Sequence, residues 1–152
     1  MLSDILHLGV TVSDLERSIT FYRDTLGLAF QGRITMDGPE TERLFGRIGC
    51  SADIAYLRGT ELVDGPSVEL IQFTDTASKK APTDIFTTSI SEICFCTDDI
   101  HREYARLREL GVEFLSAPQD FDFTKDGYGK SSAVYLRDPD GIILELMEPK
   151  DN

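Results

Sequence analysis

The chain has few basic residues for its size. Its 152 residues include 15 Lys and Arg against 27 Asp and Glu, which gives a net charge of −12 at pH 7. A surface that binds nucleic acid needs clustered Lys and Arg, so this balance argues against that class of partner. It also makes strongly anionic ligands a less favourable match, although a local basic patch would still accept one.

Long hydrophobic runs and a disulfide framework are missing as well. No apolar stretch approaches the roughly 20 residues that cross a bilayer, and the N-terminal residues do not resemble a signal peptide. The cysteines are odd in number, Cys50, Cys94 and Cys96, which fits a reducing cytoplasm better than paired disulfides. With 41% hydrophobic residues, the composition is typical of a globular protein. We therefore expect one soluble, cytoplasmic domain without a membrane partner.

Hydrophobic periodicity predicts that one order of elements occurs twice along the chain. The first set comprises strands at 5–12, 28–34, 53–58 and 67–73, and helices at 15–26 and 39–48. The second set comprises strands at 92–97, 112–115, 133–137 and 142–148, and a helix at 98–110. Ser13 or Asp14 is suited to cap the first helix, and Gly27 to end it.

Polar segments separate these elements. Residues 75–89 are rich in Thr, Ser, Lys and Pro, which predicts a linker between a first module of about 5–74 and a second of about 90–149. Asp64-Gly65 predicts a turn within the first module. Residues 121–130 are expected to form a loop that either closes over a pocket, with glycine hinges, or is a plain surface connection.

The two halves also repeat in sequence. Matching pairs are Leu26-Gly27-Leu28 with Leu110-Gly111-Val112, Tyr56-Leu57-Arg58 with Tyr135-Leu136-Arg137, and Val68-Glu69-Leu70 with Leu144-Glu145-Leu146. The segment that starts at His7 likewise lies over the one that starts at Glu92. Because these matches occur in the same order, they predict an α+β fold built from two copies of one βαβββ module.

Four ionisable side chains occupy equivalent positions on the first and last strands of the two halves: His7, Glu92, Glu69 and Glu145. Their strand neighbours are apolar and should pack against the helices, which turns these four toward the other face of each sheet. A single carboxylate on a strand is usually just solvated. Several converging carboxylates repel one another, however, and a divalent cation removes that cost. One imidazole with carboxylate oxygens suits Zn, Ni, Co, Mn or Fe(II); the alternative is a metal-free pocket for a neutral ligand.

Two segments resemble known sequence motifs. The stretch from His7 to Leu28 closely resembles the opening of the vicinal oxygen chelate superfamily, and Tyr135 to Leu146 resembles its closing motif. The family includes glyoxalase I, methylmalonyl-CoA epimerase, extradiol dioxygenases and bleomycin-binding proteins. The resemblance covers about residues 5–149, and it implies a glyoxalase-like open barrel formed by the two modules around a central cleft.

The resemblance also implies a site and a reaction. It places metal ligands at His7, Glu69, Glu92 and Glu145, although many family members have His where this chain has Glu92. It implies a metal-dependent lyase or isomerase of the glyoxalase I and methylmalonyl-CoA epimerase type. In such an enzyme, Glu145 or Glu69 would be the catalytic base that moves a proton next to a metal-chelated carbonyl of a small molecule.

Two other functions remain open within the family. A metal-free antibiotic-binding resistance protein is one, although the chain has no Trp for an aromatic groove. A non-haem iron dioxygenase is the less favoured one, because that chemistry uses two His and one carboxylate. Here His7 is the one histidine on a predicted strand, and His101 falls within a predicted helix.

The remaining expectations concern the pocket and assembly. Residues expected to line the substrate pocket are Thr11, Phe73, Cys94, Tyr135 and Met147. Cys94 and Cys96 have strand spacing and are expected to share the face of Glu92, as pocket-lining or buried residues. Open sheet edges that a second chain could cover predict a homodimer.

Overall fold

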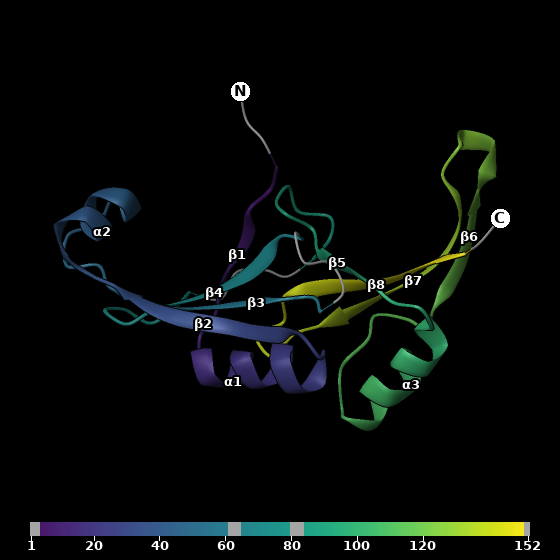
Figure 1. Ribbon diagram of the computed structural model, residues 1–152, viewed down its shortest axis with the longest axis horizontal. Coiled ribbons are helices and arrows are strands. Elements are labelled where there is room, and N and C mark those ends of the chain that lie inside the picture. Colours follow the sequence, from purple (N-terminus) through teal and green to yellow (C-terminus); the bar gives the residue numbers. More distant parts are fainter. Residues whose placement is uncertain (1–3, 61–64, 80–83, 151–152) are drawn as a thin grey trace. The chain divides into compact units, whose positions relative to one another are not determined.

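Each half of the chain folds around its own four-stranded mixed sheet (Figure 1). The computed structural model describes residues 4–60, 65–79 and 84–150, and it divides into two compact units, Met1–Lys80 and Ala81–Asn152. Asp64 of the predicted Asp64-Gly65 turn and residues 80–83 of the predicted linker lie outside the described residues. Within the described residues, no helix is both long and apolar enough to span a membrane.

Unit 1 contains one βαβββ module with an additional short helix. Its elements are β1 (His7–Thr11), α1 (Leu15–Thr20) continued by the π-helical turn η1 (Phe21–Thr25), β2 (Ala29–Met36), α2 (Gly38–Phe45), β3 (Ala52–Arg58) and β4 (Ser67–Phe73). The strand order is β1-β4-β3-β2, in which β1 is parallel to β4 and the other pairs are antiparallel.

Unit 2 repeats this topology. Its elements are β5 (Ile93–Cys96), α3 (Ile100–Glu109), β6 (Gln119–Phe123), the 3₁₀ turn η2 (Thr124–Asp126), β7 (Gly129–Arg137) and β8 (Ile143–Lys150). The order β5-β8-β7-β6, with β5 parallel to β8, matches that of unit 1. The predicted α+β class with two βαβββ modules is therefore confirmed, and both sheets are open, with edge strands on either side.

The helix boundaries follow from capping chemistry. The Asp14 carboxylate accepts the Arg17 N–H at 3.0 Å, and Gly27 adopts φ 83° where the helical segment ends. In unit 2, Asp99 accepts the Arg102 N–H at 2.9 Å in the same manner. These contacts place both helices at the positions that the sequence predicts.

A second pair of hydrogen bonds fixes which sheet face each helix covers. The Gln72 side chain accepts the Leu15 N–H at 2.7 Å, and the Glu148 side chain accepts the Ile100 N–H at 3.0 Å. Gln72 and Glu148 lie on β4 and β8, three residues after Glu69 and Glu145. Because side chains alternate along a strand, α1 and α3 cover the faces opposite these two glutamates.

The core beneath the helices consists of apolar residues that alternate with the site residues. Buried examples on β4 and β8 are Val68, Leu70, Leu144 and Leu146. The predicted packing of the strand neighbours is wrong for Leu6, which precedes β1 and is 80% exposed.

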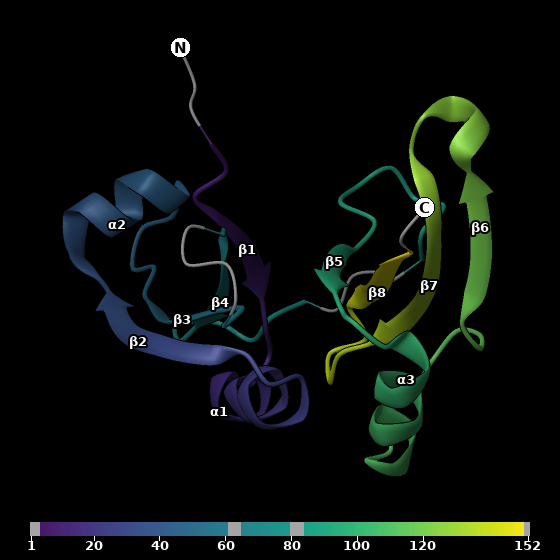
Figure 2. The same cartoon turned by 45° about the vertical axis from the view of Figure 1, so that its right-hand side comes forward.

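Two predicted elements differ from the structure. Residues 112–115 do not form a strand, and only Phe114 makes a single bridge, to Leu136 of β7. The predicted loop at 121–130 is instead part of the hairpin β6–η2–β7 (Figure 2). Gly127 and Gly129, with φ of 83° and 77°, form its tip. The interpretation of this segment as a hinged loop was wrong, because its residues on both sides of the turn are paired in the sheet.

Candidate functional site

Unit 1 brings His7 and Glu69 into direct contact. They lie on the parallel neighbours β1 and β4, where Gly9 is the register partner of Glu69. The His7 Nε2 and Glu69 Oε2 atoms are 3.3 Å apart, and the side chains are 42% and 12% exposed. An imidazole nitrogen and a carboxylate oxygen at this separation form a partly buried donor pair that a divalent cation could bridge.

Tyr56 completes this group of side chains. It is the register partner of Glu69 on β3, and its hydroxyl donates to Glu69 Oε1 at 2.7 Å. The hydrogen bond to Glu69, together with burial, raises the pKa of Tyr56 to about 12. The phenol is therefore protonated at neutral pH and acts as a donor. The Tyr56 ring also meets the His7 ring edge-on, with centroids 6.5 Å apart.

Unit 2 gathers an equivalent group around Glu145. Cys94 on β5 and Tyr135 on β7 are both register partners of Glu145, which is 9% exposed. Partial desolvation of the thiol raises the pKa of Cys94 to about 12, and the Glu145 carboxylate adds to this rise. Burial and then the Glu145 charge also raise the pKa of Tyr135. Negative charge on Glu92 contributes to both shifts, so Glu92, just before β5, lies near this group.

The residues predicted to line a pocket occupy the same sheet faces as the glutamates of their own unit. Thr11 and Phe73 lie four residues after His7 and Glu69 on their strands, and Met147 lies two residues after Glu145. Phe73 also packs edge-on against Phe45 of α2, with ring centroids 5.3 Å apart. Cys94 and Cys96 were predicted to be either pocket-lining or buried. Both are exposed, so the prediction that they are buried is wrong.

The four predicted ligands are thus divided between the units, two in each. Within the described residues, no group of three or more His, Cys, Asp or Glu side chains is arranged to hold a metal ion. Sequence reasoning missed Tyr56 as a site residue, although its repeat counterpart Tyr135 had been singled out. The match between Tyr56-Leu57-Arg58 and Tyr135-Leu136-Arg137 was the signal that could have found it.

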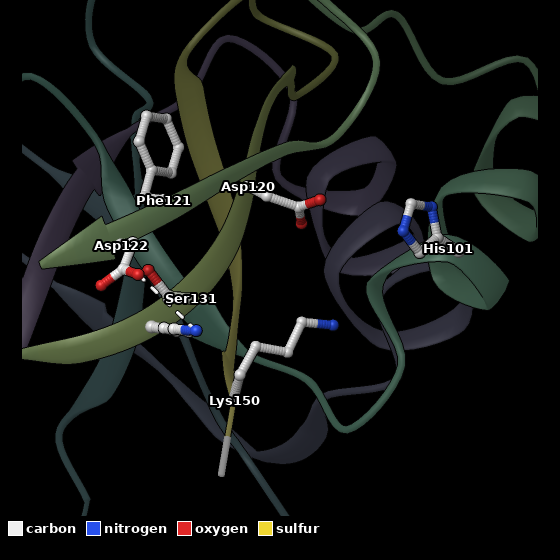
Figure 3. Close-up of a pocket in the computed structure, with 7 residues that line it drawn as sticks. His101, Asp120, Phe121, Asp122, Ser131 and Lys150 are labelled. Atoms are coloured by element: carbon white, nitrogen blue, oxygen red, sulfur yellow. Dashed lines mark ion pairs between the residues drawn. The ribbon is translucent and has the colours of Figure 1, made fainter. Parts of the chain in front are cut away.

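A separate groove of about 430 Å³ lies beside α3 in unit 2 (Figure 3). Its lining residues are His101, Asp120, Phe121, Asp122, Lys130, Ser131 and Lys150. Asp120 of β6 and His101 of α3 point toward one another across it, and the Lys130 Nζ atom is 3.6 Å from Asp122 Oδ2. None of the predicted metal ligands lines this groove, so it is distinct from the candidate site.

Comparison with known protein families agrees with this fold. The model of the Glyoxalase/Bleomycin resistance protein/Dioxygenase superfamily matches residues 4–146. The chain belongs to this superfamily. The resemblance inferred from the sequence motifs is thereby confirmed, together with the α+β fold of two four-stranded mixed sheets.

Individual proteins are similar to this chain over nearly its full length. The chain is 29% identical to the uncharacterized protein YwbC of Bacillus subtilis (strain 168) over 148 residues, which is 97% of this chain and 99% of that one. A glyoxalase family protein from Bacillus cereus has a TM-score of 0.83 at 21% identity, covering 97% and 95% of the two chains.

Two further neighbours differ in their functions. The trypanothione-dependent glyoxalase I of Leishmania major has a TM-score of 0.68 at 22% identity, covering 97% of this chain and 87% of that one. TnmS3, an antibiotic binding protein from Streptomyces sp. CB03234, has a TM-score of 0.62 at 22% identity and 98% coverage of both chains. At this identity the likeness establishes a common fold, which serves catalysis in one neighbour and binding in the other.

Proposed function

We propose that this superfamily member is a metal-dependent lyase or isomerase of the glyoxalase type, which moves a proton next to a carbonyl group of a small molecule. The observation that carries the proposal is the contact between His7 Nε2 and Glu69 Oε2 at 3.3 Å. A buried Glu145 at the repeat-equivalent position supports it. Both glutamates lie on the sheet faces opposite those that α1 and α3 cover.

The donor set fits a divalent metal ion. His7, Glu69, Glu92 and Glu145 would hold one ion of Zn, Ni, Co, Mn or Fe through one imidazole nitrogen and carboxylate oxygens. Such an ion, when bound, supplies Lewis acidity that polarises a substrate carbonyl and stabilises negative charge developing on its oxygen.

The chain's own residues would perform the proton transfer. Glu145 and Glu69 differ in their partners, because the Glu69 oxygens already contact Tyr56 and His7. In the proposed reaction Glu145 accepts a proton from the carbon next to the carbonyl and returns it to a neighbouring position.

Metal content tests the proposal directly. We expect protein purified without chelator to contain close to one equivalent of a divalent transition metal, because converging carboxylates need a counter-charge. Removing the metal by dialysis against EDTA should abolish proton exchange in D₂O, followed by NMR on 2-hydroxy carbonyl compounds and acyl thioesters. Adding the metal back should restore it. Full activity in metal-free protein would contradict the proposal.

A metal-free small-molecule (antibiotic) binding protein is the second candidate, and one observation favours it. The Phe121 and Phe123 rings on β6 are stacked with an interplanar angle of 7°, yet they are 42% and 45% exposed. Phe121 pairs with Ser131, which lies on the same face of β7 as Tyr135. This aromatic surface therefore shares the sheet face of Glu145. Metal-free protein that binds a flat ligand without turnover would support this candidate.

We also propose that the protein forms a homodimer. The strands β1, β2, β5 and β6 are the edges of their sheets, and unpaired strand edges are usually covered by another chain or protected. Light scattering coupled to size-exclusion chromatography should give about twice the chain mass of 17.0 kDa. A monomer mass at concentrations of tens of micromolar would contradict this expectation.

A further inference from the structure

The two carboxylate oxygens of Glu69 have different partners. Oε1 accepts the Tyr56 hydroxyl at 2.7 Å, whereas Oε2 is 3.3 Å from His7 Nε2. A distance of 2.7 Å is the usual length of a strong O–H···O hydrogen bond, and a charged acceptor strengthens it. Glu69 is therefore held in one orientation, with Oε2 as the oxygen turned toward the imidazole.

The repeat-equivalent tyrosine behaves differently. Tyr135 is the register partner of Glu145, as Tyr56 is of Glu69. However, among the described residues the structure contains no hydrogen bond between Tyr135 and Glu145, and the influence of Glu145 on Tyr135 is that of a nearby charge. The two modules thus present the same pair of residue types, but only unit 1 uses the phenol to hold its glutamate.

We propose that Tyr56 is a positioning residue that holds Glu69 through Oε1 and leaves Oε2, beside His7 Nε2, as the oxygen that binds the metal. This inference rests on the proposed function, since it assigns a role toward the same metal ion. The inference goes beyond the proposed function because it adds Tyr56, which is not a metal ligand, and because it names Oε2 as the donor atom of Glu69.

Tyr56 would strengthen metal binding because it orients the Glu69 carboxylate before the metal binds. A glutamate side chain has several rotatable bonds, and ordering it costs conformational entropy that weakens binding. The hydrogen bond from the half-buried Tyr56 phenol orders the Glu69 side chain when the protein folds, so this entropy is not lost again when the metal binds. Groups that orient metal ligands in this way typically contribute 10–100-fold to metal affinity. Because the Tyr56 ring also meets the His7 ring edge-on, it limits the orientation of both unit 1 donors.

The test compares Tyr56→Phe with the control variant Tyr128→Phe, at a tyrosine that is 86% exposed at the tip of the hairpin β6–η2–β7. Each substitution removes one hydroxyl and keeps the ring. Co²⁺ is titrated into the full-length, chelator-treated protein, and both the affinity and the visible d–d absorption of Co²⁺ are recorded. Titrations are carried out at a temperature where circular dichroism shows every variant to be folded. We expect Tyr56→Phe to weaken Co²⁺ binding by about 10–100-fold and to alter the absorption bands, while Tyr128→Phe binds within about twofold of the original protein.

The outcomes separate this inference from the proposed function. If the original protein binds Co²⁺ and Tyr56→Phe binds it equally well with unchanged bands, the positioning role is wrong and the metal site stands. If both tyrosine variants lose affinity equally, the hydrogen bond to Glu69 is not the cause, and the inference is overturned. If the original protein binds no Co²⁺, the proposed metal site fails and the role of Tyr56 fails with it.

Discussion

Glu145→Gln is expected to lower the rate of proton exchange by about 10²–10⁴-fold, which is the usual contribution of a positioned general base. The amide has nearly the same shape as the carboxylate, but it accepts no proton at neutral pH. Bound metal should fall as well, because a neutral amide is a weaker ligand than a carboxylate. Deuterium incorporation by NMR and elemental analysis of the purified variant measure the two effects separately.

The matched control for this variant is Glu109→Gln. Glu109 is an exposed residue at the C-terminal end of α3, so it reports the general effect of removing one negative charge. We expect unchanged metal content and rate for the control. A Glu145→Gln protein that retains both its metal and its exchange rate would remove Glu145 from the proposed site.

The second large effect is on stability. Leu144→Ala is expected to lower the free energy of unfolding by about 2–5 kcal/mol, because it leaves a cavity in a closely packed core. Leu144 is fully buried on β8, between Ile93 of β5 and Leu136 of β7 in the register. It also precedes Glu145, so loosening this strand should disturb the candidate site. Urea unfolding followed by circular dichroism measures the change.

Leu110→Ala provides the comparison for the core variant. Leu110 follows α3 and is 59% exposed, and substitutions at such surface positions usually change stability by within about 0.5 kcal/mol. If Leu144→Ala lowers the free energy of unfolding no more than Leu110→Ala does, β8 is not packed as the structure shows.

The elements with strong local signals were predictable from the sequence. Asp14 caps its helix through a side-chain hydrogen bond to a nearby backbone N–H, and Gly27 adopts the positive φ that favours glycine, so the limits of the first helix were predicted within a few residues. The repeat then gave the topology of the second module from that of the first. These features depend on neighbours along the chain, which the sequence displays directly.

The hairpin β6–η2–β7 and the role of Tyr56 depend on distant partners. Asp120 and Asp122 disfavour a strand locally, yet their segment pairs along its whole length with β7. Tyr56 reaches Glu69 only because β3 and β4 adopt one particular register. The pattern of alternation predicted which face each residue occupies, but the hydrogen bond itself arises from tertiary structure that no local signal contains.

The parallel pairing of β1 with β4 has a consequence for how the candidate site forms. His7 and Glu69 are separated by about 60 residues of chain, and closing a loop of that length carries an entropic cost that later contacts must repay. Strand pairs that are distant in sequence are associated with slow folding. The imidazole and the carboxylate therefore meet only when the first and last strands of the module are paired, so the candidate site requires the whole module and not a single strand.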